Sequence, residues 1–273
     1  MTPAKPNALS AFPRLIAVDL DGTLLHSDGS ISARNKTAIE RVRARGAEVV
    51  IVTFRAYRSA KPYVVELGLH LPLLCCNGAL VKDASDDRVI ESFPIDRSAA
   101  LQAVEYGIKH RIDQCLYIGE HYVAQADVIE KYSEGYLHQW RRCDDLRECL
   151  DEPTLMVRYF GNEPFLEAER HLAHLGFEHV QDRIRDIFEL SLMQKGVSKG
   201  SALARLARDE GVGAHEVVAI GDGRLDASML RIAALGIAMA NAAPETLAAA
   251  DEVTASNDED GVALALERLL QMP

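Results

Sequence analysis

The chain has 273 residues, a net charge of −11 and 48% hydrophobic residues, which is enough apolar material for a large core in one or two domains. The acidic excess argues against sequence-independent nucleic-acid binding, because neutralising phosphates needs clustered Lys and Arg, and against binding to anionic membrane surfaces. No apolar run is long enough for a transmembrane helix, and the first residues carry no secretory signal. We therefore expect a cytoplasmic protein whose five cysteines are reduced.

The N-terminal third alternates short apolar runs with helical stretches. Residues 14–18 form an apolar run that ends at Asp19, which predicts a buried parallel strand. A helix capped by Ser32 follows, and residues 48–53 and 71–76 are two further apolar strands with a second helix between them. Strand, helix, strand, helix, strand is the pattern of an α/β domain with a parallel sheet.

The middle of the chain, residues 83–189, is richer in charge, His and Tyr and mixes strand-like with helical pieces, which indicates an inserted α+β domain. Its strand-like pieces are residues 88–93, 114–118, 154–160 and 187–192, and its helical pieces are residues 98–110 and 165–175. Four ring-bearing residues form either a lid over a sugar or base or a part of the domain's core: Tyr132, Tyr136, His138 and Trp140.

The alternating pattern returns in the C-terminal third. A helix is predicted at residues 199–210, strands at 216–220, 236–239 and 251–254, and a last helix at 261–270. We therefore expect a Rossmann-like α/β core made of residues 1–82 and 190–273, interrupted by the α+β domain of residues 83–189.

Acidic residues follow two of the buried strands. Asp19 and Asp21 follow the first strand, and Asp222 and Asp226 follow the strand at 216–220. The carboxyl ends of parallel strands meet at one edge of a sheet, so these side chains should converge. Carboxylates gathered in one place repel each other unless a cation lies between them, and hard oxygen ligands suit Mg²⁺. Asp-Gly pairs are also common turn residues, and this simpler interpretation holds for Asp28 and Asp260.

Four strings carry a more specific signal: DLDGTLL from Asp19, Thr53 at the end of the second strand, GVSKG around Lys199, and GDGRLD from Gly221. In this order they resemble the four motifs of the haloacid dehalogenase (HAD) superfamily of phosphotransferases. Three further strings are similar to the Cof-type members, subfamily IIB: Asn77-Gly78-Ala79, residues 239–242 and residues 257–262. In that subfamily a cap domain that selects the substrate is inserted between the second and third motifs, where this chain has residues 83–189.

The resemblance implies a Mg²⁺-dependent phosphatase that acts on a small phosphate monoester, such as a sugar phosphate. Asp19 is then the nucleophile that forms an aspartyl-phosphate, and Asp21 is the general acid and base. Lys199 neutralises charge around the phosphate, and Thr53 hydrogen-bonds the phosphoryl oxygens. Further contacts to substrate or phosphate are expected from Gly22, Phe54, Arg55 and Asn77. The metal would be held by Asp19, the backbone carbonyl of Asp21, Asp222 and Asp226.

The chain departs from the subfamily's pattern at two positions. The second motif usually reads Thr-Gly-Arg, and here it is Thr53-Phe54-Arg55; Leu225 stands where the fourth motif usually has Asn. These changes leave the nucleophile, acid and metal ligands in place, but predict altered rate or selectivity. Two alternatives therefore stay open: phosphoryl transfer of the phosphomannomutase or disaccharide-phosphate type, and a weakly active or non-catalytic regulatory protein that binds a phosphorylated ligand.

Lys195 competes with Lys199 for the role of the third motif's lysine, but only Lys199 opens a helix within the GVSKG string. The expected partner is a small phosphorylated metabolite, with no nucleic acid and no membrane. The sequence distinguishes neither the substrate nor a monomer from a homodimer.

Overall fold

The computed structural model describes residues 9, 11–133, 139–184 and 186–272. The chain divides into two compact units: the first has residues 1–54, 61–89 and 198–273, and the second has residues 55–60 and 90–197. These bounds differ from the predicted domains, 1–82 with 190–273 and 83–189. The last junction lies later because the strand that ends at Met193 pairs within the second unit's sheet, and residues 55–60 were not expected in that unit at all.

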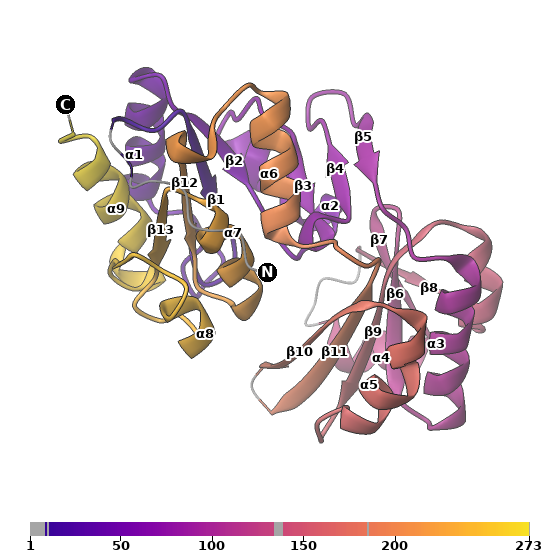
Figure 1. The fold of residues 1–273 in the computed structure, drawn as a ribbon. Helices are drawn as coiled ribbons and strands as arrows, with labels where there is room; N and C mark the ends of the chain where they lie inside the picture. The colour runs from indigo at the N-terminus through magenta and orange to yellow at the C-terminus, as the bar shows by residue number, and fades with distance from the viewer. Residues whose placement is uncertain (1–8, 10, 134–138, 185, 273) are drawn as a thin grey trace. The chain divides into compact units, whose positions relative to one another are not determined.

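A five-stranded parallel sheet forms the centre of the first unit, in the order β14-β13-β12-β1-β2 (Figure 1). Its strands are β1 (Leu15–Val18), β2 (Glu48–Ile51), β12 (Val217–Gly221), β13 (Leu235–Ala238) and β14 (Glu252–Val253). The central strand β1 is wholly buried, which explains its unbroken apolar sequence. A parallel sheet was predicted, but the predicted strand at residues 71–76 is not part of it, because that segment pairs in a separate antiparallel sheet.

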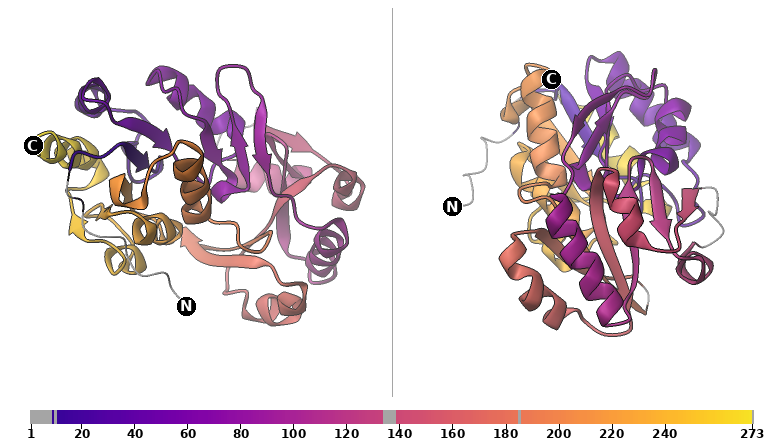
Figure 2. Two further views of the ribbon diagram at one scale, coloured as in Figure 1. Left: turned by 45° about the horizontal axis from the view of Figure 1, so that its top comes forward. Right: turned by 90° about the vertical axis from the view of Figure 1, so that its right-hand side faces the viewer.

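Helices cover both faces of this sheet (Figures 1 and 2). The helices of the first unit's segments are α1 (Ala33–Ala44), α6 (Lys199–Asp209), α7 (Ala227–Ile232), α8 (Pro244–Leu247) and α9 (Gly261–Leu269), and α2 (Tyr57–Glu66) begins in the second unit and ends in the first. Ser32 caps α1 by accepting a hydrogen bond from the backbone N–H of Asn35, as predicted. Leu203 of α6 and Leu230 of α7 pack on the sheet face that carries Ala17, and α1 packs against α9.

A small antiparallel sheet extends beyond β2. It has the order β3-β4-β5, with β3 (Leu73–Cys75), β4 (Leu80–Lys82) and β5 (Val89–Ser92), and Val52 bridges to Leu74. The turn between β3 and β4 contains Asn77, whose φ is +57°.

The second unit is built on a six-stranded sheet in the order β10-β11-β9-β6-β7-β8, antiparallel except between β7 and β8. Its strands are β6 (Asp113–Ile118), β7 (His121–Ala124), β8 (Trp140–Arg142), β9 (Thr154–Gly161), β10 (Glu178–Ile184) and β11 (Ile187–Met193). Its helices include α3 (Arg97–Lys109), α4 (Ala126–Tyr132) and α5 (Leu166–Leu172). Apolar side chains of α3 and α5 pack on one face of the sheet, with Leu116, Val157 and Leu190.

The cysteines differ from the expectation that all are reduced. Cys143 and Cys149 are joined by a disulfide, while Cys75, Cys76 and Cys115 are free and buried. The expectation of reduced thiols is wrong for this pair, whose two cysteines lie six positions apart in a stretch that no sequence pattern marks. Among the described residues, none of the helices has the length and apolar content needed to cross a membrane.

Candidate active site

Three neighbouring strands of the first unit deliver polar side chains to one edge of the sheet. Asp19 directly follows β1, Asp222 directly follows β12, and Thr53 follows β2 by two residues. β1 pairs with both β12 and β2, so the three strand ends are adjacent. This is the carboxyl edge, where open parallel sheets bind their ligands.

Lys199 is a buried cation held between two carboxylates. Its Nζ lies 2.6 Å from Asp19 Oδ1 and 2.5 Å from Asp226 Oδ1, and the three side chains are 4%, 6% and 1% exposed. Lys199 is the first residue of α6, which Ser198 caps. The two carboxylates raise the pKa of Lys199 despite its burial, so the ammonium stays charged. Lys195 is exposed and lies in the second unit, whereas Lys199 is buried in contact with Asp19.

Asp226 braces the loop that follows β12. Its Oδ2 accepts hydrogen bonds from the backbone N–H groups of Asp222 (3.0 Å) and Gly223 (2.8 Å), while its Oδ1 contacts Lys199. Both carboxylate oxygens of Asp226 therefore already have donors from the chain. This arrangement favours Asp226 as the residue that orients Asp222 and Lys199.

Asp222 completes a cluster of three carboxylates. Asp19, Asp222 and Asp226 each offer an oxygen, and these oxygens lie within 4.8 Å of one another. Burial and the charge of Asp226 raise the pKa of Asp222 to about 7. Burial and Asp226 also raise the pKa of Asp19 well above its usual value. Oxygen ligands that repel each other at this spacing fit a divalent cation, which would offset the repulsion.

The chain turns directly after Asp19. β1 ends at Val18, and Leu20 opens a turn in which Gly22 has φ +76°. Asp21 is exposed on this turn, and its charge contributes to the raised pKa of Asp19. Asp21 is therefore near the cluster but not among its three carboxylates, which fits a role in proton transfer better than one as a carboxylate ligand.

Thr53 and Asn77 are buried together beside this edge. Thr53 donates its backbone N–H to Leu74 O (2.8 Å), and the Asn77 N–H donates to Thr53 O (3.1 Å). The following Gly78 has φ +89°, and a Cβ there would lie 2.6 Å from Ser198 O. The glycine thus lets the turn after β3 approach the start of α6, where Lys199 lies.

Three further residues that the sequence analysis singled out are Phe54, Leu225 and Arg55, and none of them belongs to the carboxylate cluster. Phe54 is half-buried, so it is not part of the core, and Leu225 is also half-buried. Arg55 belongs to the second unit, where it lines a cavity.

Several residues that hold the turn of Gly22 were given no role from the sequence. Thr23 Oγ1 donates to Asp222 Oδ1 at 2.6 Å. Asn241 Nδ2 donates to Gly22 O at 2.8 Å, and Asn241 Oδ1 accepts from the N–H of Asn257 at 3.1 Å. The two asparagines belong to the strings at 239–242 and 257–262, which the sequence marked as similar to the subfamily without indicating what these residues do. In the structure, their hydrogen bonds hold the turn of Gly22 next to the carboxylate cluster.

Comparisons with known proteins agree with this geometry. The family model of haloacid dehalogenase-like hydrolases matches residues 16–266. The stress response protein YhaX of Bacillus subtilis is 32% identical over 279 residues, which cover 95% of this chain and 94% of the relative. The 5-amino-6-(5-phospho-D-ribitylamino)uracil phosphatase YitU of B. subtilis is 31% identical and covers 95% of this chain and 98% of its own.

A solved structure with the same fold is the HAD subclass IIB sugar phosphatase BT4131. It is 25% identical to this chain, with a TM-score of 0.79 over 93% of this chain and 98% of its own. The family model spans nearly the whole chain, across both units, and the strings that resemble the four motifs contain the strand-end carboxylates and the buried lysine. The chain therefore belongs to the haloacid dehalogenase-like hydrolases, as a Cof-type phosphatase of subclass IIB.

Proposed function

We propose that the protein hydrolyses a small phosphate monoester, with Mg²⁺, through a phosphorylated Asp19. The observation that carries this proposal is the position of Lys199, which is buried between Asp19 and Asp226 beside the carboxylate of Asp222. A lysine at the ligand-binding edge of a parallel sheet can contact a phosphoryl oxygen, and a divalent cation on the carboxylates would supply the remaining positive charge that a phosphate dianion needs.

In the first step, an oxygen of Asp19 attacks phosphorus, and the bond from phosphorus to the leaving-group oxygen breaks. Asp21, exposed on the adjacent turn, donates a proton to the departing alcohol. Lys199 donates to Oδ1 of Asp19, and its charge opposes the rise in the pKa of that carboxyl that burial and Asp226 cause. Thr53 lies buried at the neighbouring strand end, where its side chain would hydrogen-bond a phosphoryl oxygen.

In the second step, a water molecule attacks the phosphorus of the aspartyl-phosphate. Asp21, now ionised, accepts the proton of this water, the bond to Asp19 breaks, and inorganic phosphate leaves. Asp19 and Asp21 are thereby returned to their starting states. Lys199 and the turn of Gly22 stay in place throughout, so that most of the catalysis comes from positioning and charge.

Mg²⁺ is the cation that we propose for the carboxylate cluster, where it would neutralise charge on the phosphoryl oxygens. Asp19 and Asp222 are the two carboxylates that would hold it, together with the backbone carbonyl of Asp21. Asp226, whose oxygens accept from Lys199 and two backbone N–H groups, would act on the cation through Asp222.

The names of two relatives support the substrate class that we propose. YitU is named for a phosphorylated ribityl compound and BT4131 for sugar phosphates, so we propose a sugar phosphate or a metabolite of similar size here.

The test is release of inorganic phosphate from a panel of sugar phosphates, nucleotides and an aryl phosphate. It is run on the wild type with Mg²⁺ and with EDTA, on Asp19→Asn, and on Asp28→Asn as a matched control. Asp28 is an exposed aspartate that hydrogen-bonds Ser30 in a nearby turn. The expected result is turnover that needs Mg²⁺ and Asp19 but not Asp28.

Turnover that persists in EDTA or in Asp19→Asn would contradict the mechanism. Recovery of the phosphoryl group on another position of the sugar, with no free phosphate, would replace hydrolysis by a mutase reaction.

A further inference from the structure

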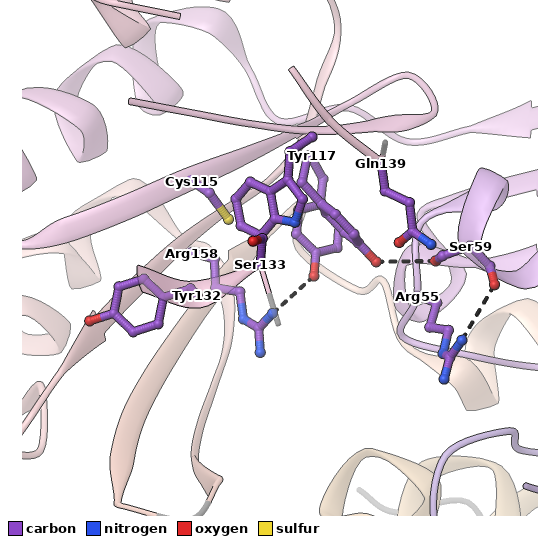
Figure 3. Close-up of a pocket in the computed structure, with 10 residues that line it drawn as sticks. Arg55, Ser59, Cys115, Tyr117, Tyr132, Ser133, Gln139 and Arg158 are labelled. Atoms are coloured by element: carbon purple, nitrogen blue, oxygen red, sulfur yellow. Dashed lines mark hydrogen bonds between the residues drawn. The ribbon is translucent and has the colours of Figure 1, made fainter. Parts of the chain in front are cut away.

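The second unit contains a cavity of about 190 Å³ on one face of its sheet (Figure 3). Side chains alternate across a strand, so Cys115 and Tyr117 of β6 and Arg158 of β9 point away from Leu116 and Val157, which pack under α3 and α5. The described residues that line the cavity are the aromatic Tyr117, Tyr122, Tyr132 and Trp140, the basic Arg55 and Arg158, and the small or polar Ser59, Cys115, Ser133 and Gln139.

One wall of this cavity is the segment that directly follows the second motif. Arg55 is separated from Thr53 by a single residue, and Ser59 lies on the first turn of α2. The segment is fastened to β7, because Tyr122 Oη accepts from the N–H of Ala56 at 3.0 Å and lies 3.3 Å from Ser59 Oγ. A molecule in this cavity would thus contact residues joined by the chain to a proposed phosphate-binding residue.

Arg158 is a largely buried cation that lines the cavity. Its guanidinium donates to Tyr117 Oη at 3.1 Å and to Glu189 of β11, and the side chains of Arg158 and Glu189 are 15% and 12% exposed. Taking both charges out of water costs more free energy than an apolar pair would, so stability alone is a weak reason for an ion pair here. A guanidinium held by two partners is, in contrast, well oriented to bind an anion.

We propose that Arg158, positioned by Glu189 and Tyr117, makes this cavity select leaving groups that carry an anionic substituent. This inference rests on the phosphatase function proposed above and names the class of substrate for it. It makes Arg158 a specificity-determining residue with no part in the bond-breaking steps.

The size and lining of the cavity define the leaving group further. A volume of 190 Å³ is below the roughly 300–1,000 Å³ of pockets for drug-sized ligands, so it suits a single ring. Tyr122 and Trp140, with ring centroids 5.2 Å apart, supply aromatic walls for that ring. Two guanidinium groups line the cavity, and none of its described lining residues is acidic, which favours a carboxylate or a second phosphate on the ring.

The experiment compares esters that differ only in charge. Phosphate release is measured with para-carboxyphenyl phosphate, its neutral isostere para-carbamoylphenyl phosphate, and phenyl phosphate. A second arm compares a hexose bisphosphate with the matching monophosphate, which separates a carboxylate from a phosphate as the preferred group.

Three variants are compared with the wild type. Arg158→Met with Glu189→Gln removes both charges, so that no buried charge is left unpaired, and Arg158→Lys keeps the charge but not the fork of donors. Arg142→Met is the matched control, because Arg142 is an exposed arginine of the same sheet that pairs with Asp144. Thermal unfolding of each variant checks that the second unit is intact.

The wild type is expected to prefer an anionic ester over its neutral partner on the order of tenfold to a hundredfold in kcat/KM, the size of a charge-assisted hydrogen bond. The double variant should lose this preference through KM while its kcat/KM for phenyl phosphate stays within about twofold, and Arg142→Met should behave as wild type. Equal preference in the wild type, or an equal loss on every ester in the double variant, would overturn the inference and leave the phosphatase intact.

If the wild type releases phosphate from none of these esters, the proposed function fails separately. Binding of para-hydroxybenzoate, followed by ligand-observed NMR, then decides the inference by itself. Binding to the wild type that is lost in the double variant supports it, and absence of binding to the wild type refutes it.

Discussion

Gly22 and Asp222 approach so closely that only a residue without a side chain fits between their loops. A Cβ built on Gly22 would lie 2.8 Å from Cγ and 2.9 Å from Oδ1 of Asp222, and the φ of Gly22 is +76°. Gly29 also has a positive φ, +82°, but a Cβ there meets nothing within 4 Å. An alanine at position 22 would therefore meet both backbone strain and a clash with Asp222, whereas an alanine at position 29 would meet backbone strain alone.

We expect Gly22→Ala to displace Asp222 and to lower kcat/KM at limiting Mg²⁺ by at least tenfold. Gly29→Ala should cost only the strain of an L-residue at positive φ, about 1–2 kcal/mol of stability, with activity retained. Phosphate release across a Mg²⁺ titration and a denaturant melt measure the two effects. Equal activity losses in both variants would show that strain, rather than the clash, governs the site.

Lys199 should be indispensable for turnover. Its charge lowers the pKa of Asp19, and its Nζ contacts both Asp19 and Asp226, so Lys199→Met removes a donor and leaves buried carboxylates uncompensated. The expected loss in kcat is about 10²–10³-fold or more, by analogy with removal of a positioned oxyanion donor. Lys195→Met is the control, because Lys195 is exposed, and its kcat should be unchanged. Steady-state rates of phosphate release with the two variants decide the matter.

Mg²⁺ should stabilise the folded protein through the carboxylate cluster. A ligand that binds only the folded state adds about 2.7 kcal/mol at a hundred times its Kd, which raises the Tm. Asp222→Asn removes a ligand and also relieves the repulsion that raises the pKa of Asp19, so its metal-free Tm should be at least that of the wild type. Differential scanning calorimetry with and without Mg²⁺ should show a Tm increase in the wild type that is absent in Asp222→Asn. Asp258→Asn, which alters an exposed aspartate that bonds Ser27, should keep the increase.

Two adjacent residues of α1 should differ sharply in their contribution to stability. Asn35 is fully buried, donates to Leu24 O at 3.3 Å and accepts from the N–H of Ala263 at 2.9 Å, which joins α1 to α9. Asn35→Ala leaves a buried donor and acceptor unsatisfied, and we expect a loss of about 2–4 kcal/mol in the free energy of unfolding. Arg34 pairs with Glu267 on the surface, and Arg34→Ala should cost at most about 1 kcal/mol. Urea denaturation of the two variants provides the comparison.

The core and its carboxylates could be predicted because local sequence determines them. A strand buried on both faces must be apolar throughout, as β1 is, and Asp19 at its end is conspicuous for that reason. Lys199 was identified by the helix start and glycines around it, and its contact with Asp226 depends on a loop that the sequence alone does not shape.

One strand of the second unit, β10, was not predicted from the sequence, and its position in the sheet explains why. β10 (Glu178–Ile184) is an edge strand, held by pairing with β11 on one side only, and its charged residues lack the alternation of a half-buried strand. The bonds of Thr23 and Asn241 join segments about two hundred residues apart, so no local pattern predicts them. Tyr132 and Trp140 line the cavity of the second unit, as one of the two interpretations of these rings allowed, whereas Tyr136 and His138 lie outside the described residues.

The hydrogen bond from the N–H of Ala56 to Tyr122 Oη limits which segments this protein can exchange with its relatives. The chain passes between the two units four times, at residues 54/55, 60/61, 89/90 and 197/198, so the second unit is not a single insertion that can be exchanged as one cassette. A chimera that received residues 90–197 from a relative would lose the acceptor for the Ala56 N–H unless the donor had a hydroxyl at the place of Tyr122. The side chain of Ser59 also lies 3.3 Å from Tyr122 Oη, so a recombination that preserves both contacts must carry residues 55–60 along, and position 59 should change in concert with position 122 as the lineage adapts to new substrates.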